Sequence, residues 1–409
     1  MRDIELYRQV LGLEKPWRVE GVELDVAGFR VDIRVEHAPG MVWNCPQCGR
    51  ELSCRDHAEE RVWRHLDTCQ FQTYVHARIP RVDCPEHGVV QVKVPWAEAR
   101  SRFTLLMERW MIDVLMQCAT VSGTCRLLGL TWDEVWGVMD RAVARGKQRK
   151  QAKVIPHLGV DEKAFRKGHS YMTVVCDLEE GRVEYVGDER TTESLSGYWE
   201  GLSAAQREGI ASVSMDMWPA YIGATLAGVP EAKDKIVFDR FHIMQHMNEA
   251  VDKVRKQEHK ELMGKQDDTL KGTLHVWRYA RENLPGKYRA TLAWLRGLNL
   301  KVSRAWAIKE SLRALWDYRS LGWAQRFFAA WFWWATHSRL EPVREVAHLL
   351  KRHLHNILTY CKLRVTNAVA EGLNSKITAI KRRACGYRNK DHFKIAIYFF
   401  CRKLDLYPR

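Results

Sequence analysis

The chain has 409 residues, which is long enough for two or three domains with full hydrophobic cores and excludes a small disulfide-stabilised fold. Its formal net charge of +15 favours a polyanionic partner such as DNA. The N-terminal residues are charged from the second position and lack the apolar core of a signal peptide, and the most apolar run, RFFAAWFWWATH, is too short to span a bilayer. We therefore expect a cytoplasmic protein without a membrane partner, in which the cysteines stay reduced.

Two short motifs near the N-terminus predict a zinc site. Cys45 and Cys48 in NCPQCGR form a C-x-x-C knuckle, and Cys84 and His87 in DCPEHGV have the same spacing, with a glycine after each pair. Two knuckles of this form bind zinc tetrahedrally, and four protein ligands leave no open position for chemistry. The sequence therefore predicts one structural Zn²⁺ held by these four side chains.

The separation between the two pairs leaves one alternative open. It is about 36 residues, more than zinc ribbons usually have. The segments VWRHLD and FQTYVHARIPRV could be strands that fill it. Cys54 and Cys69 are competing ligands, unless they are ordinary small packing residues. We expect a zinc-binding β domain over residues 1–100.

The next segment, residues 101–150, reads as helices. CATVSGTCRLLGLTWDEVWGVMDRAVARG has the form of a helix-turn-helix, in which Gly129 permits the turn. Thr131 can cap the second helix, with Glu134 in the capping-box position. This second helix is the candidate reader of the DNA major groove. The predicted contacts on it are Thr131, Trp132, Arg141 and Arg145.

A plain helical hairpin is the alternative for this segment, because Trp132 and Trp136 could both belong to a core. The run GKQRKQAK, residues 146–153, is charged and poor in apolar residues. It is therefore expected to be the linker to the next domain.

Two aspartates follow short apolar runs farther along the chain. Asp161 lies in HLGVDEKAF and Asp216 in SVSMDMWPAY, and each is expected at the end of a strand. The runs SYMTVVCDL and RVEYVGDER flank a Glu-Glu-Gly turn and predict a hairpin, and a helix, the Asp216 strand, a helix around PAYIGATLAG and a strand in DKIVFDRFH follow. This order of three strands, helix, strand, helix, strand is the RNase H-like arrangement, which places Asp161 beside Asp216.

A third carboxylate comes after a long helical stretch. Roughly 125 residues after the fifth strand have apolar side chains at three- and four-residue spacing, which indicates an all-helical insertion. Eight of the seventeen tryptophans lie in it; most should pack, and an exposed one could stack on an unpaired base. Glu371, in TNAVAEGLNSKI, is expected one turn into a helix that Thr366 could cap.

These three acids together predict a metal-dependent phosphoryl-transfer site. Carboxylate oxygens are the ligands that Mg²⁺ requires, and two such ions stabilise the attacking and leaving oxygens of a displacement at phosphorus. Chance is the competing explanation, because the chain has 50 acidic residues. A basic cluster that follows Glu371 is expected to hold DNA phosphates near this site. Its members are Lys376, Lys381, Arg382, Arg383, Arg388 and Lys390.

Four blocks in order resemble the ISL-three family of bacterial insertion-sequence transposases over nearly the whole chain. They are GVDEKAFRKGHSY, SMDMWPAY, VFDRFHIMQHMNEAVDKVR and AEGLNSKITAIKRRACGYRN. The resemblance implies a DDE catalytic core, with Asp161, Asp216 and Glu371 as the catalytic acids, interrupted by a helical domain. It also matches Asp239 and His242 to an Asp-x-x-His block that could support the active site. His169 and His246 could orient nearby groups, although a satisfied, partly buried histidine is more frequent.

The resulting prediction is a multidomain α+β and α/β DNA transposase. The zinc domain is expected at residues 1–100 and the helix-turn-helix with its linker at residues 101–150. The RNase H-like core is expected in two parts, residues 151–245 and 363–409, with the helical insertion at residues 246–362 between them. The expected cofactors are two Mg²⁺ or Mn²⁺ ions and the structural Zn²⁺. Partners would be the terminal inverted repeats, target DNA and a second copy of the chain, in a bacterial cytoplasm. A catalytically inactive DNA-binding protein and a nuclease that does not join strands are the alternatives.

Overall fold

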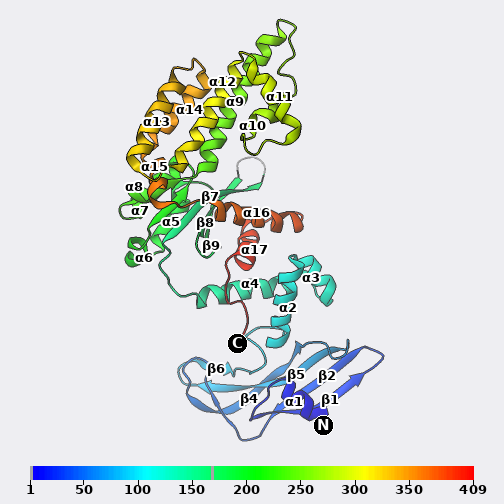
Figure 1. Ribbon diagram of the computed structural model, residues 1–409. Coiled ribbons are helices and arrows are strands. Elements are labelled where there is room, and N and C mark those ends of the chain that lie inside the picture. The colour runs from blue at the N-terminus through cyan, green and yellow to red at the C-terminus, as the bar shows by residue number, and fades with distance from the viewer. Residues whose placement is uncertain (1–2, 167–169) are drawn as a thin grey trace. The chain divides into compact units, whose positions relative to one another are not determined.

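The computed structural model describes residues 3–166 and 170–409. The chain forms two compact units (Figure 1). Unit 1 comprises Met1–Gln151 together with Ala379–Arg409, and unit 2 comprises Ala152–Thr378. Each unit has its own sheet, and the predicted sites are distributed between the two.

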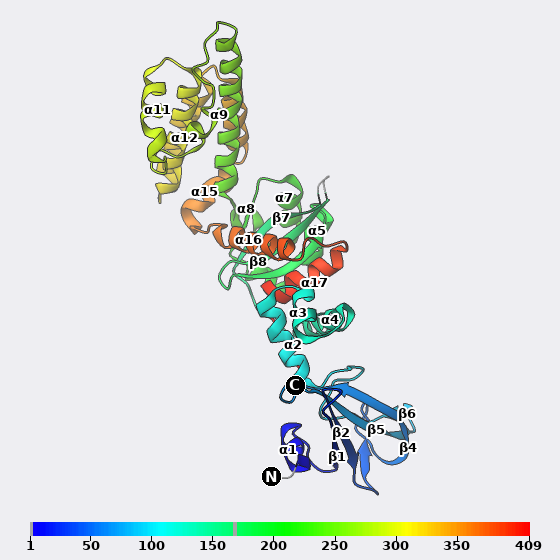
Figure 2. The same ribbon diagram turned by 90° about the vertical axis from the view of Figure 1, so that its right-hand side faces the viewer.

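Unit 1 begins with a six-stranded sheet (Figure 2). Its elements are α1 (Asp3–Val10), β1 (Trp17–Asp25), β2 (Arg30–His37), β3 (Val42–Asn44), β4 (Glu51–Arg64), β5 (Gln72–Cys84) and β6 (Gly88–Gln91). The strand order is β1-β2-β5-β4-β3, with β6 paired to the end of β5. Alternate residues of β2, namely Val31, Ile33 and Val35, are buried, so that this face of the sheet carries the core. The long strands β4 and β5 fill the gap between the two zinc knuckles.

Three helices follow in unit 1: α2 (Leu105–Cys118), α3 (Val121–Leu128) and α4 (Trp132–Arg149). Gly129 ends α3 with a φ of 65°, a left-handed conformation that glycine adopts without steric cost. The Thr131 hydroxyl accepts from the Glu134 N–H, and the Glu134 carboxylate accepts from the Thr131 N–H, so the predicted capping box is confirmed. The predicted linker is wrong over its first half, because α4 continues to Arg149.

The C-terminal part of unit 1 packs on these helices. Helix α17 (Lys390–Cys401) contacts α4 and buries the aromatic rings of Phe393 and Phe399. The last residues of the chain also reach α4, where Arg149 donates to the carbonyl oxygen of Tyr407 at 2.6 Å. The helix-turn-helix region is therefore completed by the C-terminus.

Unit 2 contains a five-stranded mixed sheet. Its strands are β7 (His157–Arg166), β8 (Ser170–Asp177), β9 (Arg182–Asp188), β10 (Ser212–Met215) and β11 (Ile236–Phe238). They lie in the order β11-β10-β7-β8-β9. The pairs β7–β8 and β8–β9 are antiparallel, which confirms the predicted hairpin, whereas β10 is parallel to both β7 and β11. Helices connect the parallel strands: α5 (Thr192–Glu200), α6 (Ala204–Glu208), α7 (Pro219–Gly228) and α8 (Ala232–Lys235).

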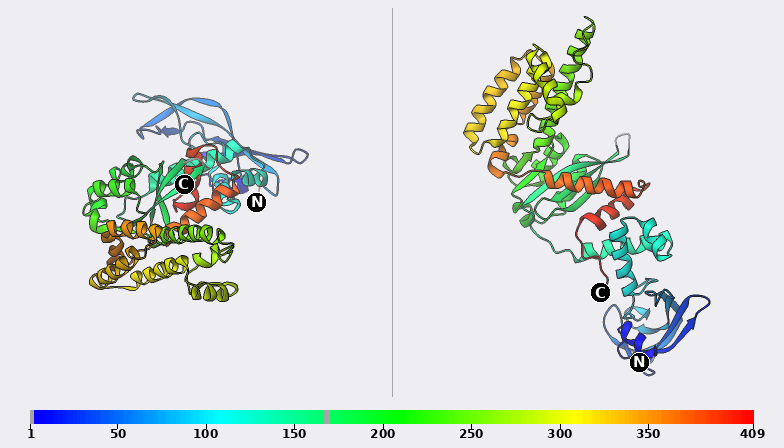
Figure 3. Two further views of the ribbon diagram at one scale, coloured as in Figure 1. Left: turned by 90° about the horizontal axis from the view of Figure 1, so that it is seen from above. Right: turned by 45° about the vertical axis from the view of Figure 1, so that its right-hand side comes forward.

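Between β11 and the helix that carries Glu371, the chain is helical (Figures 2 and 3). The helices are α9 (Arg240–Met263), α10 (Leu274–Arg278), α11 (Gly286–Gly297), α12 (Lys301–Leu312), the 3₁₀ turn η1 (Arg313–Asp317), α13 (Leu321–Thr336), α14 (Glu341–Arg352) and α15 (Leu354–Leu363). Helix α9 packs against α10, α12 and α14. No helix in the described ranges is both long enough and apolar enough to cross a bilayer.

A buried lysine links two of these helices. The Lys309 ammonium group on α12 donates to the carbonyl oxygens of Trp277 at 2.9 Å and Tyr279 at 3.3 Å, where α10 ends. Burial lowers the pKa of Lys309 to about 8, although Glu310 opposes this shift. Because its ammonium group donates to carbonyl oxygens at the end of α10, we interpret Lys309 as a structural residue.

Candidate active site and metal centre

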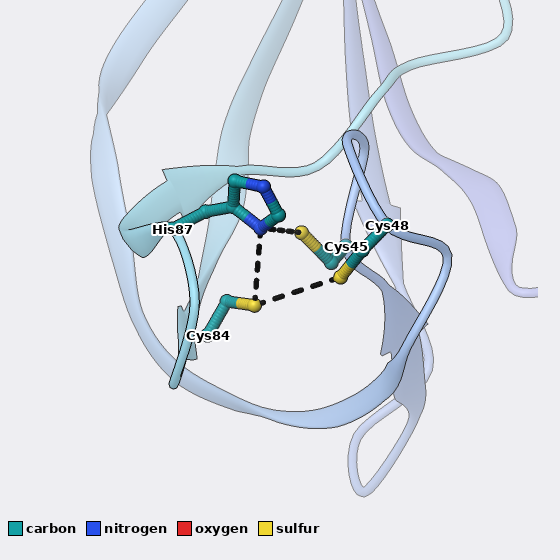
Figure 4. Close-up of side chains that lie close together, drawn as sticks. All are labelled: Cys45, Cys48, Cys84 and His87. Carbon is teal, nitrogen blue, oxygen red and sulfur yellow. Dashed lines mark hydrogen bonds between the residues drawn. The ribbon is translucent and has the colours of Figure 1, made fainter.

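The four predicted zinc ligands come together in unit 1 (Figure 4). Their ligand atoms all lie within 4.8 Å of one another. His87 Nδ1 is 3.5 Å from Cys84 Sγ and 3.9 Å from Cys45 Sγ, and Cys48 Sγ is 3.7 Å from Cys84 Sγ. Ligands bonded to one zinc at about 2.0–2.3 Å lie roughly 3.3–3.8 Å apart, so the spacing suits a tetrahedral ion.

The backbone around the knuckles favours thiolates. Hydrogen bonds from the backbone N–H groups of Cys48 and Gln47 lower the pKa of Cys45. Since zinc binds the deprotonated thiol, this turn prepares the ligand. The competing ligands lie elsewhere: Cys54 contacts the Asp56 carbonyl oxygen, and Cys69 is exposed. The Cys/His cluster supports a structural Zn²⁺ in which neither of them takes part.

In unit 2, strand register aligns three carboxylates. Gly159 of β7 pairs with Ser214 of β10, and continuing this parallel register brings Asp161 level with Asp216. Met215 pairs with Phe238 of β11, so Asp239, the next residue, is level with Asp216 as well. Asp216 directly follows β10, as predicted. Asp161 does not end its strand, because β7 pairs with β8 beyond it and continues to Arg166.

Helix α16 (Ala368–Arg383) brings Glu371 to the same region. The Asn374 amide, three residues after Glu371, donates to Asp161 Oδ2 at 2.5 Å. Lys163 of β7 donates to the Asn374 carbonyl oxygen at 3.0 Å and to the Thr378 hydroxyl at 2.5 Å. These contacts attach the first turns of α16 to β7, and residues three apart on a helix share a face. Glu371 is therefore directed toward the row of aspartates.

The segment that enters α16 also approaches β7 closely. A Cβ atom on Gly159 would lie 2.9 Å from Asn367 Oδ1 and 2.8 Å from Leu178 Cδ2, so a side chain here would displace these neighbours. The helix begins at Ala368, directly after Asn367, so the predicted capping residue Thr366 lies two residues before its first residue. Sequence reasoning missed both asparagines, although Asn374 stands one helical turn from Glu371 in EGLNSK.

The carboxylates repel one another in the absence of a cation. Burial raises the pKa of Asp161, and the negative charge of Asp239 raises it further. Partial burial and the charge of Asp239 likewise raise the pKa of Glu371. Burial and the charge of Asp216 raise the pKa of Asp239. Because partly buried carboxylates gather here and part of each shift comes from a neighbouring negative charge, this set of oxygens fits a divalent cation.

Asp239 and His242 lie where the parallel strands end. Asp239 Oδ1 accepts from the Phe241 N–H at 3.1 Å and caps α9. Asp239 Oδ2 is buried without a hydrogen-bond partner among the described residues, and His242 Nε2 is 3.9 Å away from it. His246 is two turns into α9, and His169 lies outside the described residues.

The predicted DNA contacts on α4 differ in their exposure to solvent. Thr131 and Trp132 are exposed at the start of the helix, where Trp132 stacks on Trp136 with ring centres 5.2 Å apart. His392 of α17 lies 4.2 Å from the Trp136 ring. This aromatic group is partly covered by α17, so the expectation that the tryptophans could be core residues holds in part for Trp136.

The structure corrects the predicted DNA contact at Arg145, whereas the Arg141 side chain remains 34% exposed. Arg145 is buried, donating to the Glu98 carboxylate at 2.9 and 2.6 Å and to Glu108 Oε2 at 3.1 Å. Arg141 also donates to Glu108, which is itself buried. Both guanidinium groups therefore neutralise carboxylates inside unit 1. Their positions in the sequence matched a groove-facing helix, but the buried Glu108 on α2 directs them inward.

The basic residues after Glu371 occupy the second half of α16 and the turn that follows. Lys376, Arg382, Arg383 and Arg388 are exposed, and Lys381 is half-buried. Lys381, Arg382 and Arg383 form the last turn of α16, where positive charge is favoured by the helix dipole.

Three family models match this chain. A transposase model of the ISL3 family matches residues 158–397, the helix-turn-helix domain of transposase family ISL3 matches residues 92–143, and the zinc-finger of transposase IS204/IS1001/IS1096/IS1165 matches residues 41–87. The folds and clusters described above thus belong to a protein with a zinc finger, a helix-turn-helix and a DDE transposase domain. Because the first match covers more than half of its length, the chain belongs to the ISL3 family of insertion-sequence transposases.

Two relatives extend over most of the chain. The transposase for insertion sequence element IS1001 of Bordetella parapertussis is 30% identical over 362 residues, covering 86% of this chain and 87% of the relative. The transposase for insertion sequence element IS1557 of Mycobacterium tuberculosis is 27% identical over 418 residues, covering 95% of this chain and 93% of the relative. The similarity therefore extends over most of this chain and most of each relative.

Proposed function

We propose that this protein moves an insertion sequence by binding its terminal inverted repeats, cleaving the phosphodiester bonds at its ends and joining the 3′-hydroxyl ends to target DNA. The observation that carries the proposal is the row formed by Asp161 and Asp216, with Glu371 attached through α16, in a chain of a transposase family. The relatives are named as transposases for insertion sequence elements, which supports the same substrate class. The protein would act on bacterial DNA in the cytoplasm.

We propose that the catalytic core is RNase H-like and interrupted by a helical insertion. The support is the order β11-β10-β7-β8-β9, with an antiparallel β7–β8–β9 meander and two parallel strands beside it. Helices α9 to α15 occupy the chain between β11 and α16. The domains would be residues 1–100, 101–150, 151–245 with 363–409, and 246–362.

The proposed chemistry is two successive displacements at phosphorus. Asp161, Asp216 and Glu371 would hold two Mg²⁺ or Mn²⁺ ions, which offset charge on the phosphate and favour deprotonation of the nucleophile. In the first displacement a water oxygen bonds to phosphorus as the bond to the 3′ oxygen breaks. In the second, that 3′-hydroxyl bonds to a phosphorus of the target as a target P–O bond breaks. Asn374 orients the Asp161 carboxylate, and Asp239 supports the site from the end of β11.

DNA recognition is divided between two kinds of contact in this proposal. Exposed residues at the start of α4, Thr131 and Trp132, would meet the element's ends, while Lys376, Lys381, Arg382, Arg383 and Arg388 would hold phosphates. The zinc centre would stabilise the N-terminal sheet. A homodimer or larger assembly is expected because two ends must be joined in concert.

The experiment is cleavage and strand transfer on a labelled element end. Asp161→Asn, Asp216→Asn and Glu371→Gln preserve side-chain shape and remove a charged ligand, so cleavage should fall by roughly 10²–10³-fold or more while end binding persists. Near-normal cleavage by Asp216→Asn would refute the assignment and make Asp239 the candidate. Cleavage without joining would favour the nuclease alternative, and wild-type protein that binds ends but never cuts would favour the inactive DNA-binding protein.

A further inference from the structure

Helix α13 exposes aromatic side chains that no other part of unit 2 covers among the described residues. It packs on α12, α14 and α15 through one stripe, formed by Ala324, Phe328, Trp331 and Ala335. On the outside, Trp323 is 60% exposed and Trp333 is 63% exposed. Large exposed indoles carry a cost in water, and a group of them marks an interaction surface.

These rings belong to one continuous face. Positions three, four and seven apart share one side of a helix. The exposed positions with this spacing define what we call the α13 outer face: Trp323, Arg326, Ala330, Trp333, Trp334 and His337. It lies opposite the buried stripe that packs into the helical bundle.

The charge on this face has one sign. From Arg319 to Arg339 the chain contains three arginines and no acidic residue. The Arg326 guanidinium lies 5.0 Å from the Trp323 ring centre, which places positive charge beside an open indole surface. The first acidic side chain that follows, Glu341, already forms an ion pair with Arg344 at 2.6 Å.

One of the rings is also held in place. His337 stacks on Trp333 with ring centres 4.4 Å apart and an angle of 22°, and its Nδ1 is 2.7 Å from the Trp333 carbonyl oxygen. The histidine supports one face of the indole and leaves the remaining surface exposed. A fixed, flat ring next to positive charge is the arrangement with which proteins bind the bases of single-stranded nucleic acid.

Charge distinguishes the two candidate partners of the α13 outer face, which are a second copy of the chain and DNA. If the α13 outer face met the same face of a second copy, Arg326 of each chain would approach like charges, which opposes association. A DNA strand instead supplies phosphates for the arginines and flat bases for the indoles. Duplex DNA hides the faces of its bases, whereas unpaired nucleotides expose them. We infer that the α13 outer face binds DNA with unpaired bases, an inference that rests on the proposed action on DNA.

The test is binding of the full chain to a single-stranded oligonucleotide and to an element-end duplex. Trp323→Ala combined with Trp333→Ala should weaken single-strand binding by at least about fivefold for each ring lost. Binding to the duplex end should change by less than about twofold. Trp294→Ala is the matched control, because Trp294 is 56% exposed on α11 of the same bundle but lies outside this face. Trp333→Phe, which keeps a ring, should restore most of the binding.

The outcomes are distinguishable. If the double variant binds single strands as well as Trp294→Ala does, with an unchanged melting temperature, the inference is wrong. If the variant dissociates into smaller species in sedimentation while its DNA affinity is unchanged, the face is a protein interface and the inference is again wrong. Failure of the proposed function is a separate result, since wild type would then bind both DNAs without cutting either.

Discussion

The Cys/His cluster is one proposed metal site of this protein, and the carboxylates of Asp161, Asp216, Asp239 and Glu371, which we call the acidic row, are the other. The two sites are assembled differently. The zinc ligands belong to two tight turns, and their donor atoms already lie within 4.8 Å of one another. The carboxylates come from β7, the ends of β10 and β11, and the first turn of α16. Burial, and after it the charge of a neighbouring carboxylate, raises the pKa values of Asp161, Asp239 and Glu371. Backbone turns can gather neutral or thiolate ligands locally, whereas like charges must be held together by the packed sheet and helix.

The largest effect expected from this difference is at zinc. Cys45→Ser removes one of four ligands, and structural zinc supplies on the order of 10–16 kcal/mol to small zinc domains at neutral pH. Zinc content should fall from about one ion per chain toward zero, and the N-terminal sheet should become protease-sensitive. Metal analysis and limited proteolysis measure this. Cys54→Ser is the control and should keep the zinc, because Cys54 donates to the Asp56 carbonyl oxygen and packs against the core of the sheet, away from the four clustered ligands. Equal zinc loss in both variants would contradict the ligand assignment.

The next largest effect is the loss of stability expected when the buried Arg145, whose charge is balanced by carboxylates, is removed. Arg145→Ala removes the ion pair of Glu98 and one of the two ion pairs of Glu108, which keeps Arg141 and the Ser101 hydroxyl. Breaking a buried ion pair costs about 3–5 kcal/mol. Denaturant unfolding of the full chain should show this loss. Arg382→Ala, on the exposed last turn of α16, should leave unfolding within about 0.5 kcal/mol of wild type. It should instead weaken binding to all DNA sequences and lower the salt slope by about one.

The two arginines also separate two roles. If Arg145→Ala unfolded like wild type but lost its preference for the element's end, Arg145 would be a base contact after all. The expected result is the reverse, a destabilised protein whose remaining folded fraction keeps that preference.

Local chemistry made part of this structure predictable. The capping box at Thr131 and Glu134 and the knuckle at Cys45 and Cys48 each depend on residues three apart, so their spacing is visible in the sequence. The β8–β9 hairpin follows from alternation around a short turn. The expectation that Asp161 ends its strand was wrong, because β7 gains pairing from β8 beyond the carboxylate, and such pairing has no local signal.

Long-range partners account for the other differences. Arg141 and Arg145 have the spacing of a groove-facing stripe, and only the fold places Glu108 of α2 against them. Asn374 contacts Asp161 from 213 residues away, a pairing that the sequence does not reveal. The linker predicted at residues 146–153 looked solvated by composition, yet Gly146 is packed against Leu404 near the C-terminus.

A third prediction concerns Asn374. Asn374→Ala removes the donor to Asp161 Oδ2, and residues that orient metal ligands typically contribute 10–100-fold in affinity or activity. Cleavage should fall by about that factor, and the Mg²⁺ concentration for half-maximal cleavage should rise. Mn²⁺ binding to the end complex, followed by electron paramagnetic resonance, should weaken in parallel. Thr378→Val is the control, because it removes the hydroxyl that accepts from Lys163 and donates to the Asn374 carbonyl oxygen but keeps the Asn374 amide that donates to Asp161. An unchanged metal dependence would mean that Asn374 only packs α16 on β7.

The smallest expected effect is the loss of stability caused by the negative charge of Asp239 when no cation neutralises it. Asp239→Asn keeps an oxygen that can accept from the Phe241 N–H, and so keeps the cap of α9, while removing the carboxylate charge. The folded pKa of Asp239 is raised above its unfolded value, so the carboxylate destabilises the metal-free protein at neutral pH. This cost grows as the pH rises from about 4, the unfolded pKa, through the folded pKa, and it vanishes below that range.

Without Mg²⁺, Asp239→Asn should therefore melt at a higher temperature than wild type at pH 7, and the difference should shrink toward pH 4. Adding Mg²⁺ should stabilise wild type more than the variant, because the cation relieves the repulsion that the variant lacks. The buffers should omit chelators so that the zinc stays bound. A difference in melting temperature that stays constant from pH 4 to pH 7 would show that packing, and not the charge of Asp239, separates the two proteins. In that case the acidic row would resemble the zinc centre, with ligands that the fold holds together at no electrostatic cost.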